Sequence, residues 1–414
     1  MKTRQTVLLC VGFFMAASCS LRSFGQTLEA IAILPADTFE HGPTSGQFIT
    51  PANGRIPPFV NKQPLQGISS VLRSTAGDFL VMSDNGFGAK DNSQDSVLRV
   101  HRIHPDFRTS SGGTGSIEVK SFITLSDPNH RINFHIVADL TNYPGSMVSV
   151  DPGIRNNRWL TGADFDIESV REAPDGTLWF GDEFGPFLLH TDANGKVLEP
   201  PFPLAGVKSP QNPFLGTESP TLARSHGFEG MAITPDGKTL YPMLEGPLTT
   251  DPDQRRLIIN EFDLATKQYT GRQWFYHMEA ATDTGQSIGD FTQVTDHEFL
   301  VIERDNFEGP AAGLKKIYLV DFDKLTTDGF LIKTEVADLL HLRDPFNLAG
   351  PGNGVFRFPF QTIESVIPLS DTELGVLNDN NYPFSAGRTA GQPDNNEFII
   401  IKLDRALPVS RSSN

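Results

Sequence analysis

The sequence predicts an all-β fold and, within that class, a β-propeller. Three observations support this prediction. Short runs of alternating apolar and polar residues outnumber helical patterns, the chain contains 37 Gly and 30 Pro, and one strand-turn-strand phrase recurs along it. Such a unit, repeated here at roughly 40 to 80 residues, is typical of propellers, whose blades are four-stranded sheets arranged around a channel.

Each repeat begins with a strand-like run, turns, continues as a second strand-like run and ends in Asp, Glu or Asn. Two of the turns contain Pro-Asp-Gly, which favours a tight turn. Five blades are recognisable, at residues 67–88, 166–185, 227–246, 289–306 and 364–384. A third strand follows each after a variable loop, at residues 97–104, 187–195, 256–264, 315–323 and 397–404. The divergent stretch from about residue 105 to 160 leaves room for a sixth blade.

The N-terminal run LEAIAILPA at residues 28–36 is a strand without a partner in its own repeat. We expect it to complete the last blade and close the ring, because closure protects the edge strands. We find no linker that would separate a second domain, so we expect one domain over residues 26–414.

Residues 1–25 are predicted to be a secretory signal peptide. Lys2 and Arg4 precede an apolar stretch from residue 7 to 17, and cleavage after Gly25 fits the preference for small residues. Lipid attachment at Cys19 is less favoured, because Ala16 stands where a lipobox usually has Leu. We therefore expect a periplasmic or extracellular protein without a membrane span.

Charge and cysteine content exclude several classes of function. Both cysteines lie in the predicted signal peptide, so a mature chain would form no disulfide and no cysteine metal site. Without that segment, 31 basic residues face 50 acidic ones, a net charge of −19. Such a surface repels nucleic acid, and we expect a monomer that binds a small-molecule ester or phosphate. We find no Gly-x-Ser-x-Gly elbow, P-loop or HExxH helix.

Acidic residues recur at two places in the repeats. One set opens the repeat: Glu168, Glu229, Asp290 and Glu364. The other follows the second strand: Asp84 with Asn85, Asp182 with Glu183, Glu245, Glu303 with Asp305 and Asn306, and Asp379 within 378–381. Equivalent positions in different blades converge at one rim of the channel. Carboxylates crowded there need a compensating cation, and ligands that are all oxygen suit calcium in an exported protein.

Alternative explanations exist for most of these residues. Asp175 and Asp236 lie in the turns, where Asp is an ordinary turn former. The first-strand glutamates can serve hydrogen bonding between blades, and residues 303–306 can form an internal ion-pair cluster. Asp164, Asp166 and Glu168 alternate along one face, where Arg171 is one possible partner. His226, beside Glu229, is either a structural residue or a general acid or base.

Four phrases of the sequence resemble those of the bacterial phytase-like family, which is described as having the esterase-like activity of phytase. They are GFEGMAITPDGKTLY, DIESVREAPDGTLWFGDEFGPFL, FLVIERDN and TIESVIPLSDTELGVLNDNNYPFS, and the resemblance runs from about residue 65 to 402. It implies an exported, calcium-dependent propeller with phosphoesterase or esterase-like activity. The chain departs from calcium-dependent propeller phytases in lacking a dense basic cluster for phytate.

The leading hypothesis is a calcium-dependent hydrolase of phosphate or carboxylic esters. Its predicted catalytic residues are Glu229, Glu168 and His226, and its predicted substrate contacts are Arg304 and Lys90. Its predicted metal ligands are Asp84, Asp182, Glu183, Glu245, Glu303, Asp305, Glu364 and Asp379. One alternative is a lactonase-like propeller with a single central cation near Glu229, Asn306 and Asn378. The other is a non-catalytic binding or scaffold propeller that calcium stabilises.

Overall fold

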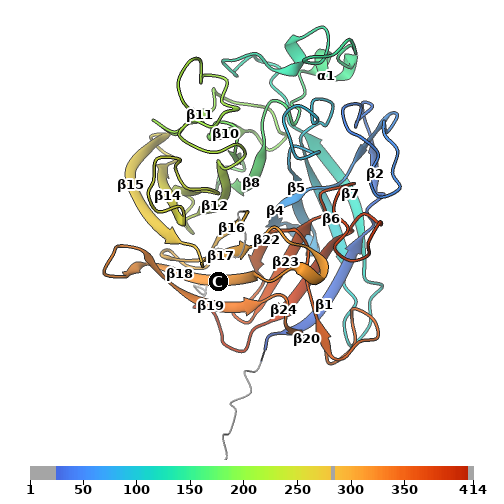
Figure 1. Cartoon of the computed structure of the whole chain (residues 1–414), viewed down its shortest axis with the longest axis vertical. Coiled ribbons are helices and arrows are strands. Elements are labelled where there is room, and N and C mark those ends of the chain that lie inside the picture. Colours follow the sequence, from blue (N-terminus) through green and yellow to red (C-terminus); the bar gives the residue numbers. More distant parts are fainter. Residues whose placement is uncertain (1–24, 281–284, 409–414) are drawn as a thin grey trace, which may run out of the picture.

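The computed structural model describes residues 25–280 and 285–408. Cys10, Cys19 and residues 1–24 of the predicted signal peptide lie outside the described part. The all-β prediction is confirmed (Figure 1). The only α-helix of the described chain is the short α1 (Pro152–Asn157), and the 3-10 turns are η1 (Thr75–Gly77), η2 (Val137–Asp139) and η3 (Gly309–Ala311). In residues 25–280 and 285–408 we find no helix with the length and hydrophobicity of a membrane span.

Three of the predicted repeats form separate four-stranded antiparallel sheets. The first contains β8 (Ile167–Glu172), β9 (Leu178–Asp182), β10 (Phe187–Thr191) and β11 (Phe202–Pro203). The second contains β12 (Phe228–Ile233), β13 (Thr239–Leu244), β14 (Arg256–Asp263) and β15 (Gln268–His277). The third contains β16 (Ser287–Gln293), β17 (Glu298–Arg304), β18 (Lys315–Leu325) and β19 (Leu331–Asp338).

The first and last repeats are joined through the N-terminal strand into one ten-stranded sheet. One half contains β4 (Ile68–Arg73), β5 (Phe79–Ser83), β6 (Arg99–Asp106) and β7 (Ser116–Thr124). The other contains β22 (Thr362–Pro368), β23 (Glu373–Asp379), β24 (Asn396–Lys402) and β1 (Thr27–Leu34), with the short β20 (Leu342–Arg343) and β21 (Val355–Phe356) beside it. Outside these sheets, β2 (Phe39–His41) pairs with β3 (Lys62–Pro64).

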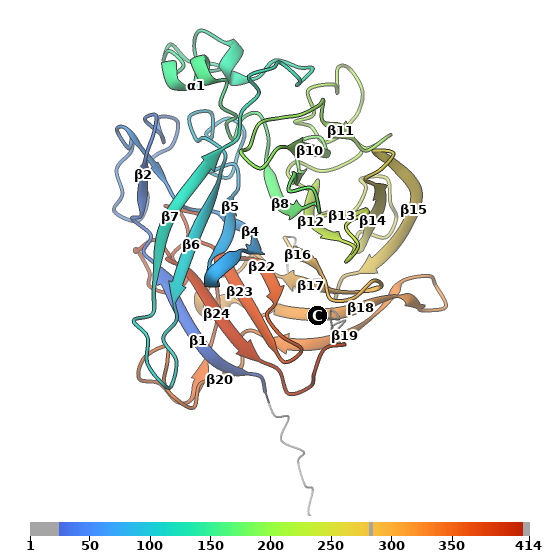
Figure 2. The same cartoon turned by 180° about the vertical axis from the view of Figure 1, so that it is seen from behind.

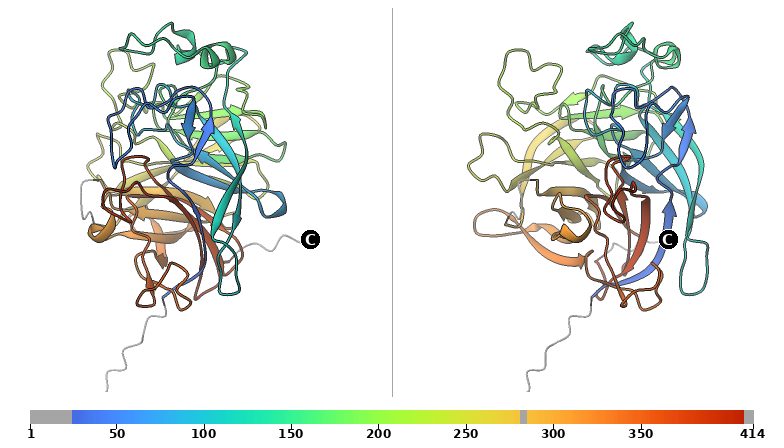
Figure 3. Two further views of the ribbon diagram at one scale, coloured as in Figure 1. Left: turned by 90° about the vertical axis from the view of Figure 1, so that its right-hand side faces the viewer. Right: turned by 45° about the vertical axis from the view of Figure 1, so that its right-hand side comes forward.

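β1 lies at the junction of the two halves of the ten-stranded sheet, between β24 and β7 (Figure 2). It pairs antiparallel with β24 along its whole length, from Thr27 opposite Lys402 to Leu34 opposite Asn396. Its link to β7 is a single parallel pair, Ile33 with Ser116. The blue N-terminal strand beside the red C-terminal strands is visible in Figure 3. A strand from the start of the chain thus completes the last antiparallel group.

The first strands of the five repeats follow one another around a nearly closed ring. β4 packs beside β8, β8 beside β12, β12 beside β16, β16 beside β22, and β22 beside β4. Residues 105–160 add β7, η2, α1 and loops to this arrangement. Apolar side chains fill the spaces between neighbouring sheets; Trp179, Met231 and Phe262, for example, belong to one buried cluster. Burial of each such side chain contributes about 1.5 to 3 kcal/mol to the free energy of folding, so these clusters stabilise the packing of neighbouring sheets.

Candidate functional site

A β-bulge recurs at the same place in the first strand of every repeat. The pairing with the second strand skips one residue there: Ser69, Glu168, Glu229, Gly289 and Glu364. A bulge bends its strand and re-aims a side chain, which is why bulges are frequent beside active sites. The three bulged glutamates all line one pocket. Three of the five first strands therefore have a glutamate at the bulge that faces this pocket. The other two, β4 and β16, have Ser69 and Gly289 at the bulge.

The second strands supply the other pocket residues. On each second strand, one residue pairs with the residue that precedes the bulge of the first strand. The next residue along the second strand lines the pocket. These following residues are Asp84, Glu183, Glu245, Arg304 and Asp379. Because side chains alternate between the two faces of a strand, the preceding residues face the other way. Four carboxylates and one guanidinium thus occupy equivalent places around the same opening.

The pocket is a cavity of about 330 Å³ in which acidic side chains dominate. Its eight carboxylates are Asp84, Asp166, Glu168, Glu183, Glu229, Glu245, Glu364 and Asp379. The basic residues that line it are Arg304, the exposed Arg224 and His226. Nine of the thirteen residues proposed from the sequence as site residues line this one pocket. Asp166, the eighth carboxylate, was noted in the sequence only for its alternation with Asp164 and Glu168.

Three of these carboxylates each have a buried oxygen without a hydrogen-bond partner: Asp166 Oδ1, Glu183 Oε1 and Glu229 Oε1. The three residues are only 2%, 4% and 4% exposed. Oxygens of Asp166, Glu168 and Glu183 lie within 4.8 Å of one another, close enough to share a metal ion. Unsatisfied buried oxygens are costly, and a cation removes that cost. The all-oxygen donor set fits a hard divalent ion.

Burial is the main cause that raises the pKa of most carboxyls in the pocket, and repulsion between neighbours adds to it. The pKa values of Glu168, Glu183, Glu229 and Asp84 lie well above the ordinary range. The pKa of Glu364 rises to about 8, and the pKa values of Asp166 and Asp379 rise to about 6. Without a cation, the pocket is therefore partly protonated near neutral pH.

Arg304 compensates part of this charge. Its Nη2 lies 3.2 Å from Glu245 Oε1 and 3.4 Å from Glu364 Oε1, and its Nη1 donates to Asn306. Its Nε is a buried donor without a partner. The side chain thus joins the third repeat to the fifth across the pocket.

His226 and Glu245 form a pair at the edge of the pocket, with 2.6 Å between Nδ1 and Oε2. Although burial opposes it, the Glu245 carboxylate raises the pKa of His226. Burial also disfavours the Glu245 carboxylate, but His226 and Arg304 outweigh that cost and lower the pKa of Glu245. Because the His226 side chain is 38% exposed, this pair can exchange a proton with a ligand at the pocket entrance.

Four residues proposed from the sequence lie outside the pocket, and their other partners explain why. Asp182 accepts hydrogen bonds from the backbone N–H groups of Asp166 and Gly185. Glu303 is bound by Lys333 at 2.8 Å and by the Tyr276 hydroxyl at 2.6 Å. These two carboxylates have structural partners on the opposite face of their strands, so the structure does not support them as pocket ligands.

The other two are Asp305 and Lys90. Asp305 lies 3.0 Å from the fully buried Lys315 and accepts two backbone hydrogen bonds from residues 313 and 314. Lys90 is directed to the Gln211 carbonyl and the Phe184 ring. The proposed internal ion-pair explanation therefore fits Glu303 and Asp305, whereas Arg304 between them faces the pocket.

Two further sequence expectations are corrected by their contacts. Asp290 lies one residue beyond its bulge and pairs with Arg171, with Oδ1 and Nη2 3.3 Å apart, so it is not equivalent to the bulged glutamates. Asn378 donates to the carbonyls of Asp379 and Asn395 instead of lining the pocket. Asn306, in contrast, does line it.

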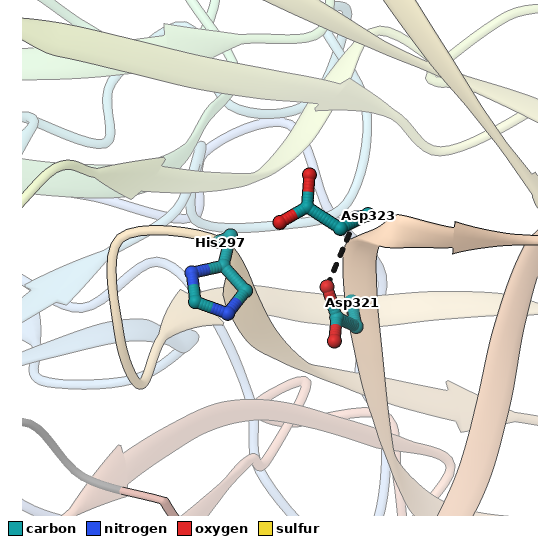
Figure 4. A group of neighbouring side chains, drawn as sticks. All are labelled: His297, Asp321 and Asp323. Carbon is teal, nitrogen blue, oxygen red and sulfur yellow. Dashed lines mark hydrogen bonds between the residues drawn. The ribbon is translucent and has the colours of Figure 1, made fainter.

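A second group with metal-ligand atoms close together contains His297, Asp321 and Asp323 (Figure 4). Asp321 already accepts from the Asp323 backbone N–H at 2.9 Å and pairs with Lys324 at 2.8 Å. His297 and Asp323 are exposed. Because Asp321 has protein partners and the other two residues are open to solvent, the cluster lacks the buried, unpartnered oxygens of the pocket.

Comparison with solved structures gives only remote similarities. A calcium-binding protein, regucalcin, from Agrobacterium tumefaciens is 13% identical with a TM-score of 0.37, over 84% of this chain and 95% of that one. A luciferin-regenerating enzyme is 14% identical with a TM-score of 0.35, over 83% and 82%. The GH43 endo-arabinanase of Bacillus licheniformis is 11% identical with a TM-score of 0.36, over 80% and 91%. Similarity at this level carries no argument about function.

Sequence comparison is more informative. An uncharacterized secreted protein of Arthroderma benhamiae is 25% identical over 258 residues, which is 51% of this chain and 50% of that protein. The chain thus spans about half the length of this relative. The model of the phytase-like protein family, described as having the esterase-like activity of phytase, matches residues 63–382. This range includes every residue that lines the pocket. The chain therefore belongs to the phytase-like family.

Proposed function

We propose that the protein is an exported, metal-dependent ester hydrolase whose active site is the acidic pocket. The observation that carries this proposal is the set of three buried, unpartnered carboxylate oxygens, on Asp166, Glu183 and Glu229. A fold that buries these oxygens without protein donors must neutralise them with a bound cation or with protons. Family membership supports ester hydrolysis as the reaction class.

We propose a five-bladed propeller, closed by β1, as the framework of this site. The five bulged first strands in ring order and the pairing of β1 with β24 support it. In such a fold the loops after the second strands of all blades meet at one rim. That geometry explains how residues as distant in sequence as Asp84 and Asp379 line one cavity.

Calcium is the cation that we propose. The donors around Asp166, Glu168 and Glu183 are carboxylate oxygens, without sulfur or imidazole in the group. Calcium takes six to eight oxygen ligands in flexible geometry, whereas magnesium demands a strict octahedron. A crowded, irregular set of carboxylates suits the larger ion.

The chemistry follows from the residues that surround this group. Asp166, Glu168 and Glu183 would hold the calcium ion, whose positive charge would polarise an ester and lower the pKa of a nearby water. Glu229 has an unpartnered Oε1 and accepts the proton of the attacking water as general base. Arg304 Nε donates to an ester oxygen, and protonated His226 gives its proton to the leaving alcohol. Glu229 then releases its proton to solvent, and His226 takes one up from solvent before the next turnover.

The charge of the pocket favours a substrate with little negative charge. Eight carboxylates line it, and the guanidinium of Arg304 is already engaged by Glu245 and Glu364. A polyphosphate such as phytate would be repelled unless several cations were bound. We therefore favour a small carboxylic ester, including a lactone, over a phosphate ester. The secreted relative supports export, and we retain the expectation of a monomer.

The proposal is tested by calcium titration and by hydrolysis assays on the same protein, with and without chelator. The substrates are p-nitrophenyl acetate, γ-butyrolactone and p-nitrophenyl phosphate. Calcium should be required for turnover. Glu183→Gln should lose calcium binding and turnover, whereas Glu229→Gln should lose turnover and still bind calcium. Asp323→Asn, in the exposed second group, is the matched control and should change neither.

Each contrary result has a definite meaning. Turnover of the lactone alone would select the lactonase-like alternative. Calcium binding that raises the melting temperature, without turnover of any ester, would select the binding or scaffold propeller and reject the hydrolase. Failure to bind calcium, magnesium or manganese would remove the metal site itself.

A further inference from the structure

The pocket is divided into two chemically different sides. On one side, Arg304 contacts Glu245 from the repeat of β12 and β13 and Glu364 from the repeat of β22 and β23. Asp166, Glu168 and Glu183, around β8 and β9, form the other. The two sides differ in how their oxygens are satisfied.

On the Arg304 side, the carboxylates have donors from the protein. Glu245 binds Arg304 with one oxygen and His226 with the other. Glu364 binds Arg304 and, at 3.1 Å, the Ser69 hydroxyl. Asp379 accepts from the Asn381 backbone N–H and the Thr362 hydroxyl. Among the described residues, none of these three carboxylates has a buried oxygen without a partner.

On the opposite side, some carboxylate oxygens have no protein donor. Asp166 Oδ1 and Glu183 Oε1 are buried and unpartnered, and the oxygens of Asp166, Glu168 and Glu183 are close enough to share an ion. Glu229 borders this group and has an unpartnered Oε1 as well. Among residues 25–280 and 285–408, no ion pair joins Asp166, Glu168 or Glu183 to a basic residue. This side is therefore the one that a bound cation would neutralise in place of protons.

Arg304 also stands where the other repeats carry an acid. The equivalent residues after the second strands are Asp84, Glu183, Glu245 and Asp379. A ring with an acid at all five places would have two groups of carboxylates to neutralise. The guanidinium at the fourth place neutralises one group permanently, because arginine does not lose its proton in proteins.

We infer that the pocket holds a single divalent ion, at Asp166, Glu168 and Glu183, and that Arg304 takes the place of a second ion. This inference rests on the proposed metal site and specifies its stoichiometry and its position. Like charges repel, so the Arg304 side excludes a divalent ion as long as the guanidinium remains. One side of the pocket thus binds the exchangeable cation, and the other has a cation that is part of the chain.

Calorimetric titration of calcium into the full mature protein tests the stoichiometry, with equilibrium dialysis as an independent count. The wild type should bind one ion per chain. Arg304→Lys, which keeps the charge, should also bind one. Arg304→Met removes the charge with similar length, leaves Glu245 and Glu364 without their shared partner, and should bind two. The apo melting temperature of Arg304→Met should fall, and saturating calcium should restore most of the loss.

A second pair of variants tests the position of the ion. Glu183→Gln should abolish calcium binding, while Asp379→Asn should leave one ion bound with an affinity within about threefold of the wild type. Circular dichroism and the melting temperature in chelator establish that each variant is folded. If Glu183→Gln fails to fold, Asp166→Asn takes its place.

The outcomes separate this inference from the proposed function. Two ions in the wild type, one ion in Arg304→Met, or loss of binding in Asp379→Asn but not in Glu183→Gln would overturn the inference and leave the metal site standing. Absence of binding in the wild type would overturn both.

Discussion

Arg171 and Asp290 form a buried ion pair that joins two inner strands which are not neighbours in the ring. Arg171 on β8 places Nη2 3.3 Å from Asp290 Oδ1 on β16, although β12 lies between these strands in the ring order. The same guanidinium donates to the Ser70 hydroxyl on β4, and Asp290 accepts from the Val366 backbone N–H on β22. One ion pair thus connects four of the five inner strands across their common centre.

Loss of this pair should be strongly destabilising. We expect Asp290→Asn to lower the free energy of unfolding by about 3 to 5 kcal/mol, because it leaves Arg171 buried without a counter-charge. The double variant Arg171→Met with Asp290→Asn should recover part of the loss. Urea denaturation measures both. Lys238→Met, which breaks the exposed pair with Asp236, is the control and should cost less than about 1 kcal/mol. A small effect of Asp290→Asn would mean that the centre is hydrated.

The apo protein should lose stability as the pH rises. The pKa values of Asp166 and Asp379 are raised to about 6 in the folded chain, and that of Glu364 to about 8. For such groups the folded state binds more protons than the unfolded state, so their stabilising contribution is present at low pH and disappears as pH rises through the folded values. In the presence of a chelator, we expect the melting temperature to fall between about pH 5 and about pH 9, a window that extends roughly one unit beyond these values on each side.

Saturating calcium should flatten this dependence, because the ion replaces the protons. Thermal unfolding in matched buffers, with calcium or with chelator, measures the difference. A melting temperature that rises with pH in chelator would contradict the raised pKa values.

His226 should contribute to turnover and not to cation binding. We expect His226→Gln to lower kcat by about 100-fold or more, as typical for loss of a general acid or base, with KM changed by less than about threefold. One limb of the pH profile of kcat should disappear with it. The exposed His341, which pairs with Asp338, supplies the control His341→Gln. An unchanged pH profile would assign His226 a structural role beside Glu245.

β1 should be necessary for the fold. Ala32 is fully buried in this strand opposite Phe398 of β24. We expect Ala32→Glu to lower the free energy of unfolding by about 3 kcal/mol or more, because it buries a charge without a partner. Glu29→Gln, at a half-buried position of the same strand, should stay within about 0.5 kcal/mol of the wild type. Equal stability of both variants would show that β1 is dispensable.

Much of the fold could be predicted from the sequence because its signals are local. Alternation of apolar and polar residues and the Pro-Asp-Gly turns define strand pairs such as β8–β9 and β12–β13 at nearly the predicted positions. The orphan run at residues 28–36 was correctly expected to pair with the last repeat. The acids that end the second strands were visible for the same reason, since each follows a recognisable strand.

The sequence by itself determined that acids gather at the ends of these strands; only the tertiary structure decided which of them face the pocket. Glu183 faces it and Asp182 does not, and Arg304 faces it while Glu303 and Asp305 bind lysines. The physical reason is the two-residue period of a strand, in which a shift of one residue reverses the direction of a side chain. The bulges add such a shift, so Glu229 enters the pocket while Asp290, one residue past its bulge, holds Arg171.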